Sequence, residues 1–560
     1  MSATSTTSGG DVPAPGPPAV RRDGRTGLVG TGALVRFALR RDRVRLPAWL
    51  LALTLSTYAM AVALVDSFPD EAAREAVRAS STSPATLALN GPAHYLDDYH
   101  YGAMLGHQAI GFVGLFVALL CVLTVVRHTR AEEETGRAEL LRATAVGRHA
   151  HLTAAVLVAA GAALGVGILT GLALSSLDAT GYTPAGALAF GAAYAGLGLV
   201  FTGVAAVTTQ ISAHARAASG TALAVLGAAY ALRAAGDSTA GGSTDWLSWL
   251  SPVGWAQRTY PYLDNDVGPL LLCLGTAGVL TAGGFVLSLR RDVGAGLRAS
   301  RPGRREATAW LTRPVGFALR LHRGLLYGFT AAVVVLGAMY GSVLGDVESM
   351  LQDIDVMQDA LGDLGGGVVE SFAALVMVPQ ATIVGVYAVL ATLRARAEES
   401  SGRAEHLLAT ALSRRSWLGS HIAVALVGST VVSTVGGLTF GTVGAVATGD
   451  GSLVLDMALA GLAYAPALWV TVGVAVMLVG WAPRAAGLAW AVPVGAFLLG
   501  YLGALMRFPT WVLRLDPFGH VPRLPAEAMQ WTPLLVLTAL AAVLVRVGLA
   551  GFRRRDLDTR

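Results

Sequence analysis

The sequence predicts an all-α polytopic membrane protein with about twelve transmembrane helices, arranged as two parallel six-helix repeats. Three observations predict this class: 54% of the 560 residues are hydrophobic, only 14% are charged, and a nineteen-residue segment occurs twice. Soluble domains carry about 25% charged residues. A disulfide scaffold is excluded because the chain has two cysteines.

The twelve spans follow from the length of the apolar stretches, since a helix needs about 20 mostly apolar residues to cross the hydrocarbon core. In the first half they lie at 46–66, 103–126, 151–176, 185–210, 216–234 and 268–289. In the second half they lie at 325–345, 370–393, 417–446, 452–479, 484–505 and 532–552. The signals of 216–234 and 484–505 are the weakest, and 417–446 has room for an exposed turn.

The distribution of arginine supports this span count. With the N-terminus inside, the cytoplasmic face holds 33 Arg and the outer face 7. Cytoplasmic loops retain positive charge in membrane proteins, and omitting one early span would place 290–324, with its nine Arg, outside. We therefore predict a multi-pass protein of the plasma membrane whose two termini are cytoplasmic.

The chain divides into four parts. Residues 1–30 are rich in Ser, Thr, Gly and Pro and are predicted to be a disordered cytoplasmic N-terminus. Residues 31–295 form the first six-helix half, 296–324 a cytoplasmic linker, and 325–560 the second half.

A short segment before the first span, 34–43, is apolar on one helical face and basic on the other. Such a segment lies along the inner membrane interface, although a plain juxtamembrane anchor is an equal alternative. The stretch Val315–Arg323 has the same character.

The repeat is the most specific signal in the sequence. Residues 130–148 and 396–414 align without a gap at an offset of 266, with 13 of 19 positions identical, and each copy follows the second span of its half. A shorter echo relates Ser251–Trp255 to Asp516–His520 at an offset of 265. Because six is even, the two halves have the same orientation about an axis along the membrane normal.

Each repeated segment is predicted to be one short cytoplasmic helix. Glu132 and Glu139 are seven residues apart, as are Glu398 and Glu405, so each pair would share a helical face. These charges suit docking into a groove on a partner protein; the alternative is a solvated, salt-bridged connector. Surface charge alone gives no reason for two near-identical copies, which favours docking.

These motifs resemble the permeases of ABC-2-type exporters, in particular a fused twelve-span actinobacterial branch linked to antibiotic and multidrug export. The resemblance is carried by Arg-Ala-Glu-Glu-x-x-Gly-Arg-Ala-Glu after spans two and eight. The segment Leu-x-Arg-x-x-Leu-Arg-Arg-Asp-Arg and the Ser-Pro-x-Gly-Trp sequence before span six support it. It covers most of the chain and implies the ABC-2, type V exporter-like architecture.

The resemblance implies that 130–148 and 396–414 are coupling helices seated on two copies of a separately encoded ABC ATPase, and that 34–43 is a connecting helix. The implied coupling residues are Glu132, Glu133, Gly136, Arg137 and Glu139 in the first half, and Glu398, Glu399, Gly402, Arg403 and Glu405 in the second. Trp246–Tyr262 and Trp511–Trp531 would be partly re-entrant outer elements. The second copy has Ser400 for Glu134 and His406 for Leu140, which leaves open whether the two ATPase contacts are equivalent.

All 41 basic residues are arginine. A Walker A loop needs a lysine to reach the terminal phosphates, so we expect no cofactor in this chain, and ATP and Mg bound by the partner ATPase. No catalytic Ser/His/Asp set is evident, and His149 and His151 lack a further metal ligand nearby. We therefore expect a transport subunit rather than an enzyme, with no metal site and no nucleic-acid partner.

The predicted spans carry few charges, which weakens a proton-coupled mechanism; Arg546 lies near a cytoplasmic end, and Asp456 and Glu370 at outer ends. The polar residues suited to a substrate cavity are His107, Gln108, Gln380, Tyr387 and Trp469. Hydrogen bonding between helices is the alternative role for such residues.

We therefore predict the permease subunit of an ATP-driven ABC exporter that moves lipophilic antibiotics or drug-like compounds out of the cell. Its partners would be the ATPase, membrane lipids and the small-molecule substrate. A proton- or ion-driven transporter of the major facilitator type is the alternative, because it also has two parallel six-helix halves. Its usual Gly-x-x-x-Asp-Arg-x-Gly-Arg-Arg pattern between spans two and three is absent.

Overall fold

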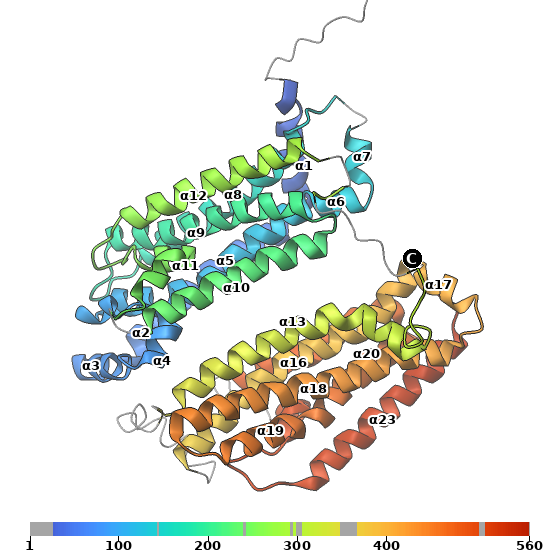
Figure 1. Ribbon diagram of the computed structural model, residues 1–560. Coiled ribbons are helices and arrows are strands. Elements are labelled where there is room, and N and C mark those ends of the chain that lie inside the picture. Colours follow the sequence, from blue (N-terminus) through green and yellow to red (C-terminus); the bar gives the residue numbers. More distant parts are fainter. Residues whose placement is uncertain are drawn as a thin grey trace, which may run out of the picture. The chain divides into compact units, whose positions relative to one another are not determined.

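The structure is a computed structural model made of α-helices and short 3-10 helices (Figure 1). It describes residues 26–142, 145–238, 242–291, 295–297, 305–345, 347, 367–502 and 510–558. Within these ranges there is no strand, and eleven helices are long and apolar enough to cross a membrane. The prediction of an all-α polytopic membrane protein is confirmed.

The chain divides into two compact units. The first comprises Met1–Pro69 and Asn90–Ser300, and the second comprises Asp70–Leu89 and Arg301–Arg560. The domain boundaries drawn from the sequence stay predictions, and most of residues 1–30 lie outside the described part of the chain.

The first unit holds six of the spanning helices. They are α2 (Arg45–Ser67), α5 (Tyr101–Arg127), α8 (Ala150–Leu174), α9 (Pro184–Ile211), α10 (Ala215–Asp237) and α12 (Gly268–Leu289). Helix α9 contacts α5, α8, α10 and α12 and is the centre of the unit. Its glycines allow close approach: a Cβ on Gly191 would lie 2.2 Å from the carbonyl oxygen of Gly167 in α8. Small residues at such crossings bring helix backbones together in membranes.

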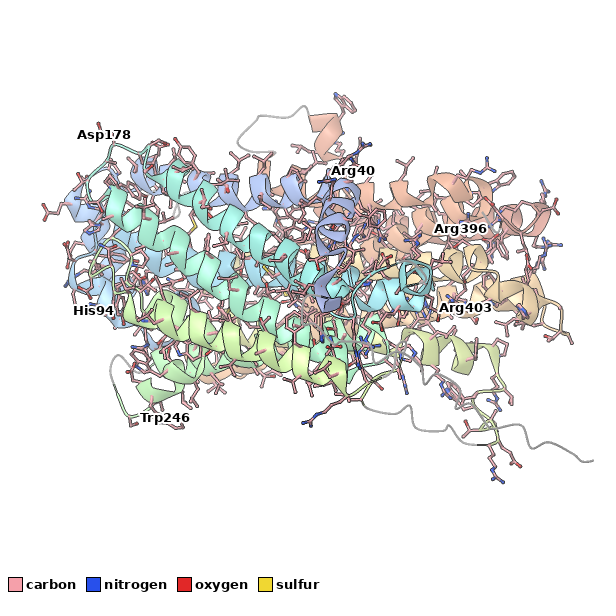
Figure 2. All side chains as sticks on the ribbon, turned by 90° about the horizontal axis from the view of Figure 1, so that it is seen from above. Arg40, His94, Asp178, Trp246, Arg396 and Arg403 are labelled. Atoms are coloured by element: carbon pink, nitrogen blue, oxygen red, sulfur yellow. The ribbon has the colours of Figure 1, made fainter. Side chains whose placement is uncertain are left out.

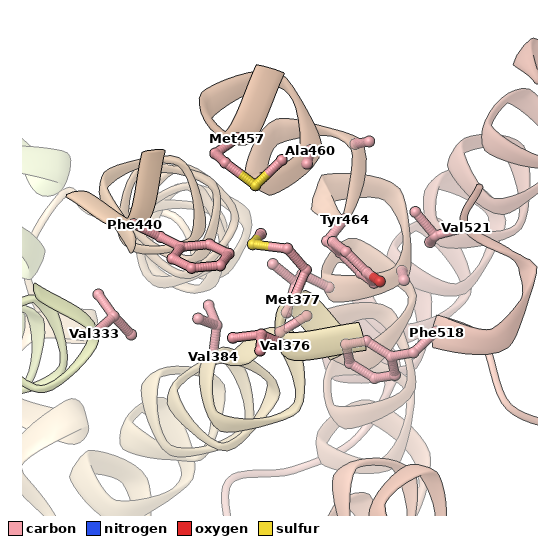
Figure 3. Packing of buried hydrophobic residues seen from close by; sticks show 14 of the residues in the cluster. Val333, Val376, Met377, Val384, Phe440, Met457, Ala460, Tyr464, Phe518 and Val521 are labelled. Atoms are coloured by element: carbon pink, nitrogen blue, oxygen red, sulfur yellow. The ribbon is translucent and has the colours of Figure 1, made fainter. Parts of the chain in front are cut away.

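The second unit is built from α13 (Pro314–Val343), α16 (Val368–Ser400), α18 (Arg414–Thr448), α19 (Leu453–Ala463), α20 (Ala465–Trp481), α21 (Ala491–Leu502) and α23 (Trp531–Arg554). Met377, Phe440, Met457 and Tyr464 meet in its apolar core (Figure 3). As in the first unit, glycine allows a close crossing, because a Cβ on Gly437 of α18 would lie 2.1 Å from the carbonyl oxygen of Met457 in α19.

The predicted spans 417–446 and 452–479 correspond to the candidate spans Arg414–Thr448 and Leu453–Trp481, and the structure adds detail to both and to 484–505. The predicted span 452–479 is two helices, α19 and α20, which meet at Tyr464. The stretch 417–446 lies within the continuous helix α18, so the exposed turn considered there is wrong. The stretch 484–505 contains a 3-10 segment, Pro483–Trp490, and the short helix α21, and it runs into residues outside the described part. At about 1.5 Å of rise per residue, the twelve residues of α21 do not reach across a bilayer by themselves.

The segment before the first span forms a separate helix, α1 (Thr31–Arg41). Leu34 and Ala38 are buried one turn apart, whereas Arg36 and Arg40 are exposed, as Figure 2 shows for Arg40. The counterpart Val315–Arg323 is not separate, because α13 begins at Pro314 and continues into the span.

Short elements connect the longer helices. Helices α6 (Arg130–Glu134) and α7 (Arg137–Arg142) join α5 to α8, and α17 (Arg403–Leu408) joins α16 to α18. At the other end of the first unit, α11 (Pro252–Gln257) packs on α5, α9 and α10, within the segment whose re-entrant character stays a prediction. Its second-half counterpart contains α22 (Thr510–Leu513) and the 3-10 turn Phe518–His520.

Candidate coupling site

Each repeated segment folds as two helical pieces with a sharp turn between them. Gly136 has φ of 71° and Gly402 has φ of 74°, a left-handed conformation that glycine adopts without strain. The prediction of a single short helix is therefore wrong. Glu132 is buried while Glu139 is exposed, and Glu398 is buried while Glu405 is exposed, because the glycine redirects the chain between them.

In the first half, the two buried glutamates bind arginines of the same unit. Arg41 of α1 donates to Glu132, and Arg137 lies 4.0 Å from the same carboxylate. Glu133 accepts from Arg130 at 2.8 Å and from Arg291, beyond the end of α12, at 2.7 and 3.0 Å. Glu132 thus ties the loop to α1, and Glu133 ties it to the last helix of its half.

In the second half, the glutamates make comparable pairs. Glu398 accepts two bonds from Arg403, at 2.6 and 3.1 Å, and this hydrogen bonding raises the pKa of Arg403. Glu399 accepts two bonds from Arg555, beyond the end of α23, at 2.5 and 2.8 Å. Arg396 lies 3.5 Å from Glu399.

The two halves therefore share one arrangement, which we call the Glu–Arg clamp: Glu133 with Arg130 and Arg291, and Glu399 with Arg396 and Arg555. Each clamp also reaches the end of a further helix. Nε of Arg291 donates to Gln210 at the end of α9 over 2.6 Å, and Nε of Arg555 donates to the Val479 carbonyl of α20 over 3.2 Å. A displacement of the repeated loop would thus be transmitted to two spanning helices of its own half.

Sequence reasoning missed Arg291 and Arg555. A signal was available, because Arg290-Arg291-Asp292 and Arg554-Arg555-Asp556 follow the sixth span of each half at a common offset of 264. This Arg-Arg-Asp motif is short, and it lies far in sequence from the glutamates that its second arginine binds.

The surface of each loop is formed by its second short helix. On α7, Glu139 is exposed and Leu140 is 74% exposed. On α17, Glu405 and His406 are exposed, and so is Arg403 at its start. Of the ten predicted coupling residues, Glu132, Glu133, Glu398 and Glu399 make internal contacts, and Arg403 is exposed but binds Glu398. Arg137, Glu139 and Glu405 are exposed.

The connecting segments of the two halves correspond in sequence but make different contacts. Phe37–Arg43 aligns with Phe317–Arg323, which puts His322 at the position of Asp42. The buried Asp42 binds Nε2 of His128 at 2.7 Å and Nε of Arg127 at 3.0 Å. His322 instead lies 2.9 Å from a ring nitrogen of His421 in α18.

The five residues predicted to line a substrate cavity lie in contacts between neighbouring elements of their own units. His107 bonds Tyr99 and the Gly91 carbonyl, and Gln108 points to Tyr99. Gln380 and Tyr387 pack against Gly436 and Gly428 of α18, and Trp469 donates to Thr430 over 3.0 Å. Their role as substrate contacts stays a prediction, and these contacts fit helix packing.

A buried charged group at the other end of the first unit was also missed. Arg233 and Asp237, both fully buried in α10, lie 3.9 Å apart. Arg258, just after α11, reaches Asp237 at 3.3 Å and Asp245 at 2.5 Å. Arg233 lies within the predicted span 216–234 and Asp237 lies three residues beyond its end, so this span carries a buried charge that was not singled out. An Arg and an Asp four residues apart at the end of an apolar stretch were the available signal.

The second unit contains a mostly apolar cavity of about 420 Å³. Its lining includes Leu375, Val378, Tyr464 and Phe518, together with the charged residues Asp516 and Arg523. Among the described residues, no group of three His, Cys, Asp or Glu side chains is arranged to hold a metal ion.

Comparison with known proteins gives a family and a relative. The chain matches the family model described as multidrug efflux system permease Rv1217c, C-terminal domain, over residues 33–287 and 311–553. It is 43% identical over 541 residues to the multidrug efflux system permease protein Rv1217c of Mycobacterium tuberculosis (strain ATCC 25618 / H37Rv). The alignment covers 95% of this chain and 96% of that protein.

Proposed function

Because the chain belongs to the family of the multidrug efflux system permease Rv1217c, we propose that it is the membrane subunit of an ATP-driven ABC exporter. It is a transport subunit rather than an enzyme. The compounds that it exports are small, lipophilic antibiotics or drug-like molecules.

The energy comes from a separately encoded ATPase. A chain whose basic residues are all arginine lacks the lysine of a Walker A loop, so ATP and Mg bind to the partner. Two copies of that ATPase contact the permease, one at each repeated loop.

The observation that carries this proposal is the Glu–Arg clamp, present in both halves. In each loop a buried glutamate joins the segment to the last helix of its half, while the following short helix exposes a carboxylate. Charge-assisted bonds between Arg and carboxylate are strong and directional. This arrangement supports a role in which α7 and α17 contact the ATPase and the clamps transmit the contact to the spanning helices.

The proposed mechanism follows from these connections. Closure of the ATPase pair on ATP displaces α7 and α17. The clamp passes the displacement to α9 and α12 in the first half, through Gln210 and Arg291. In the second half it passes to α20 and α23, through Val479 and Arg555. The permease then switches between inward- and outward-facing states.

The location of the protein is the plasma membrane, with both termini in the cytoplasm. The excess of arginine on the predicted inner loops supports this orientation. The apolar cavity of the second unit supports a lipophilic substrate, since pockets with an apolar wall and few polar groups suit such compounds.

An ion-driven carrier is not favoured by the family. The buried Asp237 also fits a structural role better than a proton relay, because it binds Arg233 and Arg258 and joins α10 to the segment after α11.

The test is co-purification in detergent with the separately encoded ABC ATPase. Glu139→Arg with Glu405→Arg reverses the exposed charges on α7 and α17, and the ATPase should be lost. A matched control, Glu71→Arg with Asp178→Arg, reverses two exposed carboxylates elsewhere and should retain it. Binding of the ATPase by both variants, or by neither, would refute the docking assignment.

A further inference from the structure

A polar cavity of about 370 Å³ lies behind the repeated loop of the first unit. Its lining includes Thr129, Glu133, Arg148, His151, Gln210, Ser288 and Arg291. This volume falls within the range of about 300–1,000 Å³ usual for small-molecule sites. The cavity lies between the chain before α8 and the end of α12.

The same place in the second unit is filled. Trp417 stands at the position of His151 (offset 266), and Phe552 at the position of Ser288 (offset 264). The two rings stack with centroids 5.6 Å apart, and both side chains are buried. The duplication has therefore kept the clamp in both halves, but it has left a polar cavity in only one of these two places.

The charges around the cavity favour an anion. Glu133 is bound by both Arg130 and Arg291, so these three groups carry one net positive charge. Arg148 adds a second positive charge. One of its N–H groups donates to the Leu289 carbonyl at 3.0 Å, and a guanidinium has five N–H donors.

The position of the cavity indicates the depth of its ligand in the membrane. Val146, which lines the cavity, also packs with Leu34 of α1 and with Ala150. Helix α1 exposes Arg36 and Arg40 beside Phe37, which is 52% exposed. A helix of this kind lies at the level of lipid headgroups, so the cavity lies there as well.

We propose that this cavity binds a phosphate group, and that Arg148 is its principal contact. The chemistry is that of a phosphate ester or free phosphate: a compact anion that accepts bonds from the guanidinium of Arg148. The imidazole of His151 and the hydroxyls of Thr129 and Ser288 already donate to backbone carbonyls, so they shape the cavity rather than supply its donors. An anionic lipid headgroup and inorganic phosphate both carry this group. The inference goes beyond the coupling proposal, and its test needs no ATPase.

The experiment measures bound lipid and thermal stability on the full chain in detergent. Native mass spectrometry records retention of phosphatidylglycerol against phosphatidylcholine, and unfolding is followed with each lipid or with inorganic phosphate alone. Arg148→Gln removes the charge, and His151→Trp with Ser288→Phe fills the cavity with the residues of the other half. Arg414→Gln removes the equivalent arginine where no such space exists and is the matched control.

We expect the wild type to retain one anionic lipid and to be stabilised by it. Retention should fall about tenfold in Arg148→Gln, the size expected when a hydrogen bond between charged groups is lost. The filled variant should also lose it, while Arg414→Gln should behave as the wild type. If inorganic phosphate alone stabilises the wild type and not Arg148→Gln, the site takes free phosphate rather than a headgroup.

Two results would overturn the proposal. One is a wild type that shows no preference for anionic lipid and no response to phosphate. The other is an equal loss of binding in Arg148→Gln and Arg414→Gln, which would indicate diffuse attraction to a basic surface rather than a site. The variant His151→Trp with Ser288→Phe distinguishes a specific site from diffuse attraction, because it fills the cavity and keeps every arginine.

Discussion

The two loops of the repeat differ in how they join the spanning helix before them. In the second half, α16 continues through Arg396 to Ser400, so the clamp glutamate sits on the last turn of a span. In the first half, α5 ends at Arg127 and the glutamate lies on the separate helix α6. The clamp itself is the same in both. Duplication has thus preserved the ion pairs while allowing the backbone around them to change.

The largest effect should come from breaking the clamp. Glu133→Gln and Glu399→Gln each leave two arginines without their carboxylate, and removing one partner of a buried pair costs about 3–5 kcal/mol. Both side chains are nearly inaccessible, with relative exposures of 6% and 1%. Thermal unfolding in detergent should show a lowered Tm for both variants. A clear loss for only one of them would mean that the clamps are not equivalent.

The next largest loss of stability should come from the buried charges of Arg233, Asp237 and Arg258, at the end of the first unit away from the repeated loop. Asp237→Leu removes the carboxylate that lies 3.9 Å from the fully buried Arg233, and we expect the free energy of unfolding to fall by about 3 kcal/mol. Arg233→Leu with Asp237→Leu should be less destabilising than Asp237→Leu alone, because the buried guanidinium is removed together with its carboxylate. The Tm of the single and double variants measures this coupling; additive losses would contradict it.

Adding a methyl group at a close helix crossing should lower stability by a similar amount in both halves. Gly191→Ala and Gly437→Ala would each place a Cβ within 2.2 Å of a carbonyl oxygen, and overpacking of this kind costs about 1–3 kcal/mol. Gly161→Ala is the control, because no atom lies within 4 Å of the added carbon. Its Tm should be unchanged or slightly raised. A neutral Gly437→Ala would show that the second crossing is looser than the first.

The smallest effect concerns pH. Asp516 accepts the N–H of Phe518 at 2.9 Å, and burial raises its pKa. Ser251, its counterpart, accepts from Val253 at 3.1 Å and has no charge. Because the pKa of Asp516 is raised in the folded state, the folded protein binds this proton more tightly than the unfolded protein does. The free energy of unfolding therefore falls as the pH rises from the unfolded-state pKa of Asp516 through its folded-state pKa. Asp516→Ser should remove that slope from Tm measured between about pH 4 and 7; an unchanged slope would assign it to another group.

The sequence predicted most of the fold because apolar length and arginine distribution are local properties. Predicted spans such as 46–66 and 268–289 end within two residues of α2 and α12. The helix break at Tyr464 lies within an unbroken apolar stretch, and its local signal, Pro466 in the first turn of α20, was not used in the prediction.

The repeated loops were located correctly, but their internal geometry was not predicted. A seven-residue spacing indicates a shared face only along an unbroken helix, and one left-handed glycine ends that correspondence. Which glutamates are buried depends on Arg41, Arg291 and Arg555, which are distant in sequence. The partners of a buried charge are a tertiary property that spacing within one segment does not contain.

The turns at Gly136 and Gly402 have a consequence for how this transporter can change. They separate the buried glutamates from a short helix that exposes Glu139 and Leu140 in one loop and Glu405 and His406 in the other. Ala138 and Ala404 on the same short helices are buried, and Arg403 binds Glu398, so these positions are held by the fold. Substitutions at the exposed positions can therefore accumulate without unfolding the chain, and the exposed surface of one loop can change independently of the other.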